Sequence, residues 1–167
     1  EPAGTVRSVA LAAARREWES FQILVRSDSP VKGVNLEPGE FAGPDGAVIR
    51  AADAVLYRQH QHELTQPTYR NTDFKPGWYP DALIPFRHPL TRRPLGDARI
   101  KAVPFDLPAN ETHGFWVDVL VPAGAKPGKY HGTYRVIREG HAVAAVTVEL
   151  TVWDFELPRV STLQTAF

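Results

Sequence analysis

The sequence predicts an all-β protein, a sandwich of two antiparallel β-sheets with a long, ordered, proline-rich loop. Three observations lead to this fold class. Short segments alternate apolar and polar residues with a period of two, turns rich in proline and glycine separate them, and no long amphipathic helical pattern is present. At 167 residues the chain has the size of one domain and can bury well over half of the surface that its unfolded form exposes.

The C-terminal third has the clearest strand pattern. Valine and leucine alternate with threonine and glutamate over residues 146–153, as in a half-buried strand, and residues 129–138 and 115–121 alternate in the same way. Glu139-Gly140 predicts a tight hairpin because glycine tolerates a positive φ, and Pro122–Gly128 predicts a turn. We therefore expect three consecutive antiparallel strands in this part of the chain.

The N-terminal part is also strand-like, with one ambiguous stretch. Residues 21–25 and 31–36 follow strand patterns separated by a break at Ser29-Pro30. Residues 10–19 (ALAAARREWE) have high helix propensity, but they lack an N-cap and a continuous apolar stripe, and so short a helix is marginal. We favour a strand, a turn at residues 15–17 and a second strand, in a fold that is Ig-like in general architecture.

Proline dominates residues 63–108, which hold eight of the fifteen prolines. Proline removes a backbone donor, so this segment is expected to be neither a central strand nor a long helix. Phe74, Trp78 and Phe86 give the segment apolar surface to bury, which argues against disorder. We expect an ordered excursion that packs on the sandwich or on a neighbouring domain.

Composition argues against several functional classes. Lysine plus arginine equal aspartate plus glutamate at 19 each, so no net charge attracts nucleic acid or an anionic membrane. The chain has no cysteine, hence no disulfide and no thiolate ligand. No apolar run approaches the roughly 18 residues of a membrane span. We expect neither a nucleic acid nor a membrane as a partner.

The sequence ends on apolar residues, whereas a free C-terminus is usually solvated. We therefore expect residues 1–157 to form the sandwich domain and residues 158–167 to be a linker and the start of a further domain. The candidate interdomain linker residues are Asp154, Phe155, Pro158 and Phe167.

Four segments, taken in order, resemble one known family. They are residues 12–26 (AAARREWESFQILVR), 77–85 (GWYPDALIP), 114–134 (GFWVDVLVPAGAKPGKYHGTY) and 151–167 (TVWDFELPRVSTLQTAF). They look like the N-terminal β-sandwich domain of bacterial proteins similar to glycoside hydrolase family 123. In that family an Asn-Glu-Trp-Glu segment followed by Phe-Gln opens the sandwich, and this chain departs from it only at Arg16, where the family has asparagine.

The resemblance implies a larger parent enzyme. In such proteins a (β/α)₈ barrel follows the sandwich and carries the active site, so the catalytic acidic pair would lie beyond Phe167. The implied activity is that of an N-acetylhexosaminidase, an exo-acting N-acetylgalactosaminidase in family 123 itself, in which the acetamido group of the sugar attacks the anomeric centre. The specific sugar is not carried over to this chain. The resemblance also implies a secreted bacterial enzyme, hence an extracellular location.

The residues themselves offer no convincing catalytic pair. Glu17 and Glu19 lie beside the predicted turn, where solvated strand-end charges explain them, and Asp118 lies on the polar face of its strand. The other acids considered are Asp73, Asp81 and Asp154. No serine lies in a nucleophile elbow and no phosphate loop is present. We expect no catalytic residue, cofactor or metal in this chain.

His60 and His62 are the best candidate metal ligands, because residues two apart on a strand share a face. No third ligand is evident, so hydrogen-bonded strand histidines are the simpler interpretation.

Trp78, Tyr79 and Asp81 form the candidate contact site. Aromatic rings beside a carboxylate recognise sugars, since the ring covers the C–H surface and the acid accepts hydroxyl hydrogen bonds. Packing against another domain is the favoured alternative for these residues.

The sequence therefore favours a non-catalytic accessory domain that buttresses its own barrel and contributes to the substrate cleft. The face that meets the barrel should expose apolar residues. Two alternatives stay open: an independent carbohydrate-binding module, and a purely structural Ig-like spacer.

Overall fold

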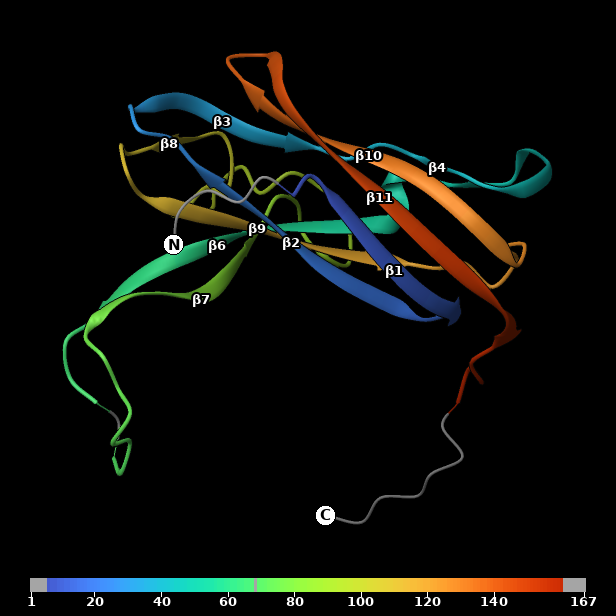
Figure 1. Ribbon diagram of the computed structural model, residues 1–167, viewed down its shortest axis with the longest axis horizontal. Coiled ribbons are helices and arrows are strands. Elements are labelled where there is room, and N and C mark those ends of the chain that lie inside the picture. Colours follow the sequence, from blue (N-terminus) through green and yellow to red (C-terminus); the bar gives the residue numbers. More distant parts are fainter. Residues whose placement is uncertain (1–5, 68, 161–167) are drawn as a thin grey trace.

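The computed structural model describes residues 6–67 and 69–160, which form two facing β-sheets (Figure 1). The strands are β1 (Ser8–Arg15), β2 (Trp18–Arg26), β3 (Val31–Glu37), β4 (Phe41–Ala42), β5 (Val48–Ile49), β6 (Ala54–Leu64), β7 (Gly77–Pro85), β8 (Phe105–Leu107), β9 (Thr112–Leu120), β10 (Gly128–Arg138) and β11 (His141–Glu156). Two short 3₁₀ turns, η1 (Pro44–Gly46) and η2 (Ala51–Asp53), lie between β4 and β6. The prediction of an all-β fold with two sheets is confirmed for the described residues.

Sheet A has seven strands in the described part of the chain, in the order β1-β11-β10-β3-β8, with β4 paired to both β10 and β5. β10 and β11 form a long antiparallel hairpin. Its two connecting residues, Glu139 and Gly140, both have positive φ values, 47° and 83°. Such a turn has the twist that two antiparallel strands need, so the predicted hairpin is confirmed.

Sheet A is mixed rather than purely antiparallel, which corrects the prediction. β1 pairs in parallel with β11, from Ser8 beside Thr147 to Ala13 beside Val152. The chain leaves sheet A after β1 and enters the other sheet with β2, so no hairpin connects β1 to its neighbour. Two strands far apart in the sequence are free to pair in either direction.

Sheet B has the order β2-β9-β6-β7 and is antiparallel throughout. The expectation of three consecutive paired strands was therefore wrong for the first of them: β9 pairs with β2 and β6, not with β10. The connection after Val121, rich in proline and glycine, carries the chain from sheet B to sheet A instead of folding it back as a hairpin.

The ambiguous stretch at residues 10–19 is a strand, a turn and a strand, as predicted. Arg16 has a φ of 68°, and its N–H donates to the carbonyl of Val121 at 2.8 Å. The Glu17 carboxylate accepts a hydrogen bond from the Ala14 N–H at 2.7 Å. The turn is thus held both by its own side chain and by the end of β9.

The proline-rich segment is not a loop throughout, which corrects a second prediction. Residues 77–85 form β7, and residues 105–107 form β8. β7 lies at the edge of sheet B, and Pro80 stands opposite Gln61, where the pairing with β6 shifts register. An edge strand with an irregular register tolerates a missing N–H, so the prediction that this segment is not a central strand holds.

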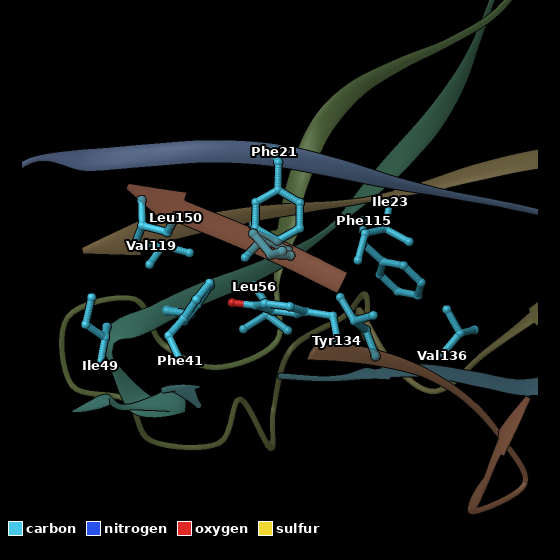
Figure 2. Close-up of a cluster of buried hydrophobic side chains, with 14 of the residues drawn as sticks. Phe21, Ile23, Phe41, Ile49, Leu56, Phe115, Val119, Tyr134, Val136 and Leu150 are labelled. Atoms are coloured by element: carbon cyan, nitrogen blue, oxygen red, sulfur yellow. The ribbon is translucent and has the colours of Figure 1, made fainter. Parts of the chain in front are cut away.

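The core lies between the two sheets (Figure 2). Tyr134 of β10 meets Phe21 of β2 edge to face, with ring centroids 5.1 Å apart, and Phe41 at 6.2 Å. Leu56 and Phe115 from sheet B and Leu150 from sheet A belong to the same cluster. Each such side chain contributes on the order of 1.5–3 kcal/mol when fully buried. The inward faces of the alternating strands thus build one shared core.

Within residues 6–67 and 69–160, no helix has the length and apolar character required to cross a lipid bilayer.

Candidate functional site

The outer face of sheet B is the surface that combines apolar, aromatic and acidic side chains. Its members follow from the strand register: Phe21, Val117 and Leu56 point into the core, so the residues between them point outward. We use the term sheet B outer face for Trp18, Ser20, Gln22 and Leu24 of β2, Trp116, Asp118 and Leu120 of β9, Val55, Tyr57 and Gln59 of β6, and Leu83 of β7.

Asp118 is the polar centre of this face. Its Oδ1 atom accepts a hydrogen bond from the Ser20 hydroxyl and another from the Trp116 indole N–H, both at 2.6 Å. Burial and the negative charge of Asp118 raise the pKa of Tyr57, while Arg92 acts in the opposite sense. The two hydrogen bonds fix the indole ring along β9, so the aromatic surface there is held in place. Asp118 lies on the outer face of its strand, as the alternation predicted, but β9 is a central strand and Asp118 is half-buried there.

Gln59 is a buried polar residue of the same face, only 7% exposed. Its side chain lies across Gly114, where a Cβ atom would collide with the Gln59 amide oxygen and would crowd Leu24. Gly114 therefore makes room for an amide that covers the centre of the sheet. The sequence offered no signal for this contact, since it depends on the pairing of β6 with β9.

Large apolar side chains surround this polar centre and remain open to solvent. Trp18 is 47% exposed, Leu24 58% and Leu83 40%. Several large apolar side chains exposed on one sheet face are usual at a contact with another domain or a ligand. The far ends of β6 and β7, residues 61–64 and 77–81, form a projection that we call the β6–β7 extension. Figure 1 shows that this extension and the described C-terminal segment both project to the side of the molecule on which sheet B lies. Whether this face is the one that meets another domain stays a prediction.

The predicted contact residues Trp78, Tyr79 and Asp81 lie on β7, in that extension. Trp78 is 66% exposed. Tyr79 is used locally: its hydroxyl donates to the Lys75 carbonyl at 2.7 Å, and its ring stacks on Phe74 with centroids 6.2 Å apart. Consecutive strand residues point to opposite faces, so Trp78 and Tyr79 do not form one continuous platform.

Of the predicted linker residues, Asp154 and Phe155 lie within β11, and Pro158 comes after its end. The Asp154 carboxylate lies 3.4 Å from the Arg15 guanidinium, and the Leu157 N–H donates to the Arg15 carbonyl at 3.0 Å. Phe155 stacks on Trp153, with ring centroids 5.6 Å apart and an interplanar angle of 13°. β1 therefore holds the chain up to Leu157. The exposed Pro158 follows this last contact, and Phe167 lies outside the described residues.

The remaining sequence candidates are placed as follows. Glu17 belongs to the β1–β2 turn, and Asp73 and Asp81 are exposed. The rings of His60 and His62 are 4.8 Å apart, on one face of β6 as predicted. In the part of the chain that the structure describes, no group of three histidine or acidic side chains is arranged to hold a metal ion.

Comparison with solved structures finds a similar fold. A family 123 glycoside hydrolase from Clostridium perfringens, solved in a study of glycolipid glycan hydrolysis, matches with a TM-score of 0.71 at 17% identity over 91% of this chain and 24% of that one. Weaker matches are the N-terminal domain of PorA (TM-score 0.32, 10% identity, covering 92% of each chain) and AvmM, which catalyses macrocyclization in alchivemycin A biosynthesis (0.38, 11%, covering 96% of this chain and 89% of that one). A comparison with curated proteins gives no match.

The chain thus spans about a quarter of the length of the clostridial enzyme, whose fold it shares over nearly its whole length. The family described as "Glycoside hydrolase 123 N-terminal domain" matches residues 3–138, which is most of the sequence. The chain belongs to the family of glycoside hydrolase 123 N-terminal domains.

Proposed function

We propose that this domain is non-catalytic and that it buttresses the catalytic barrel of its parent glycoside hydrolase through the sheet B outer face. The observation that supports this most is the exposure of Trp18, Leu24 and Leu83 around a polar centre that is already hydrogen-bonded. A solvent-facing sheet would normally carry polar residues at such positions. The β6–β7 extension, which carries Trp78, would then border the substrate cleft.

A pair of matched substitutions tests the docking surface. Leu24 is 58% exposed on sheet B, and Val143, at the tip of the β10–β11 hairpin, is 56% exposed. In the 167-residue chain, Leu24→Asp and Val143→Asp should each change stability by less than about 0.5 kcal/mol, as exposed substitutions usually do.

In the full-length parent the two variants should differ. Leu24→Asp would bury a charge in the interface and should lower the melting temperature by several degrees, whereas Val143→Asp should not. Equal melting temperatures for both variants in the parent would contradict docking through this face.

Hydrolysis assays test the non-catalytic role. The 167-residue chain should release no product from aryl glycosides above the buffer blank, because the acidic pair implied by the family resemblance lies outside it. Product release by the purified chain that is reproduced with a second, independent preparation would refute the proposal.

A second candidate function is carbohydrate binding, which the exposed Trp78 ring favours. Isothermal titration calorimetry against a panel of oligosaccharides should then give a saturable signal. Trp78→Ala should abolish this signal, whereas Trp153→Ala, near the C-terminal end of β11, should retain it. Flat titrations across the panel would remove this candidate and leave docking as the role of the extension.

A further inference from the structure

A cluster of basic side chains lies on β6 and β9, outside the sheet B outer face. Arg58, His60 and His62 are alternate residues of β6 and share one face of the strand. The rings of His60 and His62 are 4.8 Å apart. Arg58 Nη2 donates to His60 Nδ1 at 3.4 Å. Since a guanidinium can only donate, this imidazole nitrogen must be unprotonated in the contact.

Arg58 has no anionic partner among the described residues. Its guanidinium lies over the Phe105 ring, 5.0 Å from the centroid, and its Nε atom is buried without a hydrogen bond. Burial lowers the pKa of this arginine. Arg58 as a whole is half-buried, and a partly buried guanidinium with an unpaired Nε atom and no anion beside it can still gain from a bound anion.

Basic groups outnumber free acidic groups around His60. The pKa of His60 is held below its ordinary value by burial and then by His62, Arg58 and His113, all basic groups. Asp81 of β7 and Asp106 of β8 are not among the charges that act on His60. The Glu111 carboxylate lies 3.0 Å from His113 Nε2 and is engaged there. Glu63 follows His62 on β6, and strand alternation places it on the opposite face.

This environment favours an anion over a metal ion. Two histidines on one strand face could begin a zinc site, but the Arg58 guanidinium beside His60 repels a divalent cation. A guanidinium and protonated imidazoles present only N–H donors, and these match the oxygen atoms of a carboxylate or sulfate. His62 is exposed, which leaves the cluster open to solvent.

We propose that Arg58, His60 and His62 form a binding site for a small oxyanion, a carboxylate or a sulfate. His113, the neighbouring basic group on β9, is already paired with Glu111. A carboxylate can come from an acidic sugar or from an acidic side chain elsewhere in the parent protein. The second source rests on the proposed function, whereas the site itself does not. Binding would supply the charge that Arg58 lacks. Arg58 would then donate to the anion instead of to His60 Nδ1, which frees that nitrogen to take a proton and favours the protonated form of His60.

The test is an NMR titration of the imidazole groups in the 167-residue chain. It is run at equal ionic strength in sodium chloride, sodium sulfate, sodium acetate and sodium glucuronate. Sulfate or a carboxylate should raise the pKa of His60 by about half a pH unit relative to chloride, because an opposite charge nearby favours the protonated form. The exposed His141, at the start of β11, should not respond. Equal pKa values in all four salts, or equal shifts at His141, would overturn the proposal.

Comparison of acetate with glucuronate distinguishes an acidic sugar from an acidic protein side chain as the source of the carboxylate. A stronger response to glucuronate than to acetate indicates an acidic sugar, and equal responses indicate a simple carboxylate such as a protein side chain.

Three variants check that the cluster itself is responsible. Arg58→Gln should abolish the response of His60, while Arg135→Gln, an exposed arginine of β10, should retain it. If Arg58→Gln does not fold, the exposed His62 is replaced instead. His62→Gln should weaken the anion affinity, measured through the signal of His60, at least threefold. A full response in His62→Gln would contradict the site.

Discussion

Two tyrosines of β10, both fully buried, differ in a single hydrogen bond. The Tyr130 hydroxyl donates to the Lys126 carbonyl at 2.9 Å. The Tyr134 hydroxyl, visible as the oxygen atom in the core in Figure 2, has no partner among the described residues, and burial raises its pKa far above the ordinary value. A satisfied hydroxyl stabilises the fold, whereas an unsatisfied one costs free energy.

Removal of each hydroxyl should therefore have opposite effects. Tyr130→Phe should lower the free energy of unfolding by about 1 kcal/mol, and Tyr134→Phe should leave it unchanged or raise it by up to about 1 kcal/mol. Urea denaturation of the two variants and the parent sequence measures this. A comparable loss in both would show that the Tyr134 hydroxyl has a partner in solution, such as a buried water.

Acid should destabilise the domain through His60. Its pKa in the folded chain is lowered, first by burial and then by His62, Arg58 and His113. The unfolded chain therefore binds this proton at higher pH than the folded chain does, so stability falls as the pH drops below about 6.5, the ordinary histidine value, toward the lowered one.

Thermal melts between pH 7.5 and pH 5 in chloride buffer measure the effect. His60→Gln should lose less stability over this range than the parent sequence, and His141→Gln should lose as much as the parent. A pH dependence that is identical in the parent sequence and His60→Gln would show that His60 is not responsible.

The sequence indicated on which face of its strand a side chain lies, but not which side chains of other strands it contacts. Alternation placed Trp116 and Asp118 on one face of their strand, yet the contact with Ser20 needs the register of β2 against β9. Likewise, the pair His60 and His62 was identified at once, while Arg58 became significant only when the structure showed it without an anion.

At the scale of the element, the positions of the strands in the sequence were predicted better than the pairing of the strands in the sheets. Local alternation identified β9, β10 and β11, and the two-residue turn at Glu139-Gly140 fixed the pairing of β10 with β11. Pairing of β1 with β11 and of β9 with β2 joins residues far apart in the sequence, which no local pattern specifies. The prolines correctly excluded a central strand in residues 63–108, but because of them the edge strand β7 was not predicted.

Hydrogen exchange should reveal this difference between central and edge strands. β9 lies between β2 and β6, so its amides should be the most protected of sheet B. The amides of Gly77, Trp78 and Tyr79, on the exposed half of β7, should exchange at least about a hundredfold faster. Similar protection of β7 and β9 in the isolated chain would contradict this assignment of the edge.

At the scale of the whole molecule, the two sheets, their shared core and the exposed apolar surface agree with an accessory domain. The sequence predicted the sandwich and its family because both depend on strand patterns and short motifs that the chain itself carries. The location of the proposed docking surface could not be predicted, since it requires knowing which alternating face of each strand points outward in the assembled sheet.

The central claim is that the sheet B outer face is covered in the full-length parent. Hydroxyl-radical footprinting of the 167-residue chain and of the parent tests it directly, by measuring the oxidation rates of Trp18, Leu24 and Leu83. The account predicts that these rates fall severalfold in the parent while the rate of Val143 is unchanged. Equal rates for the sheet B residues in the two proteins would contradict it.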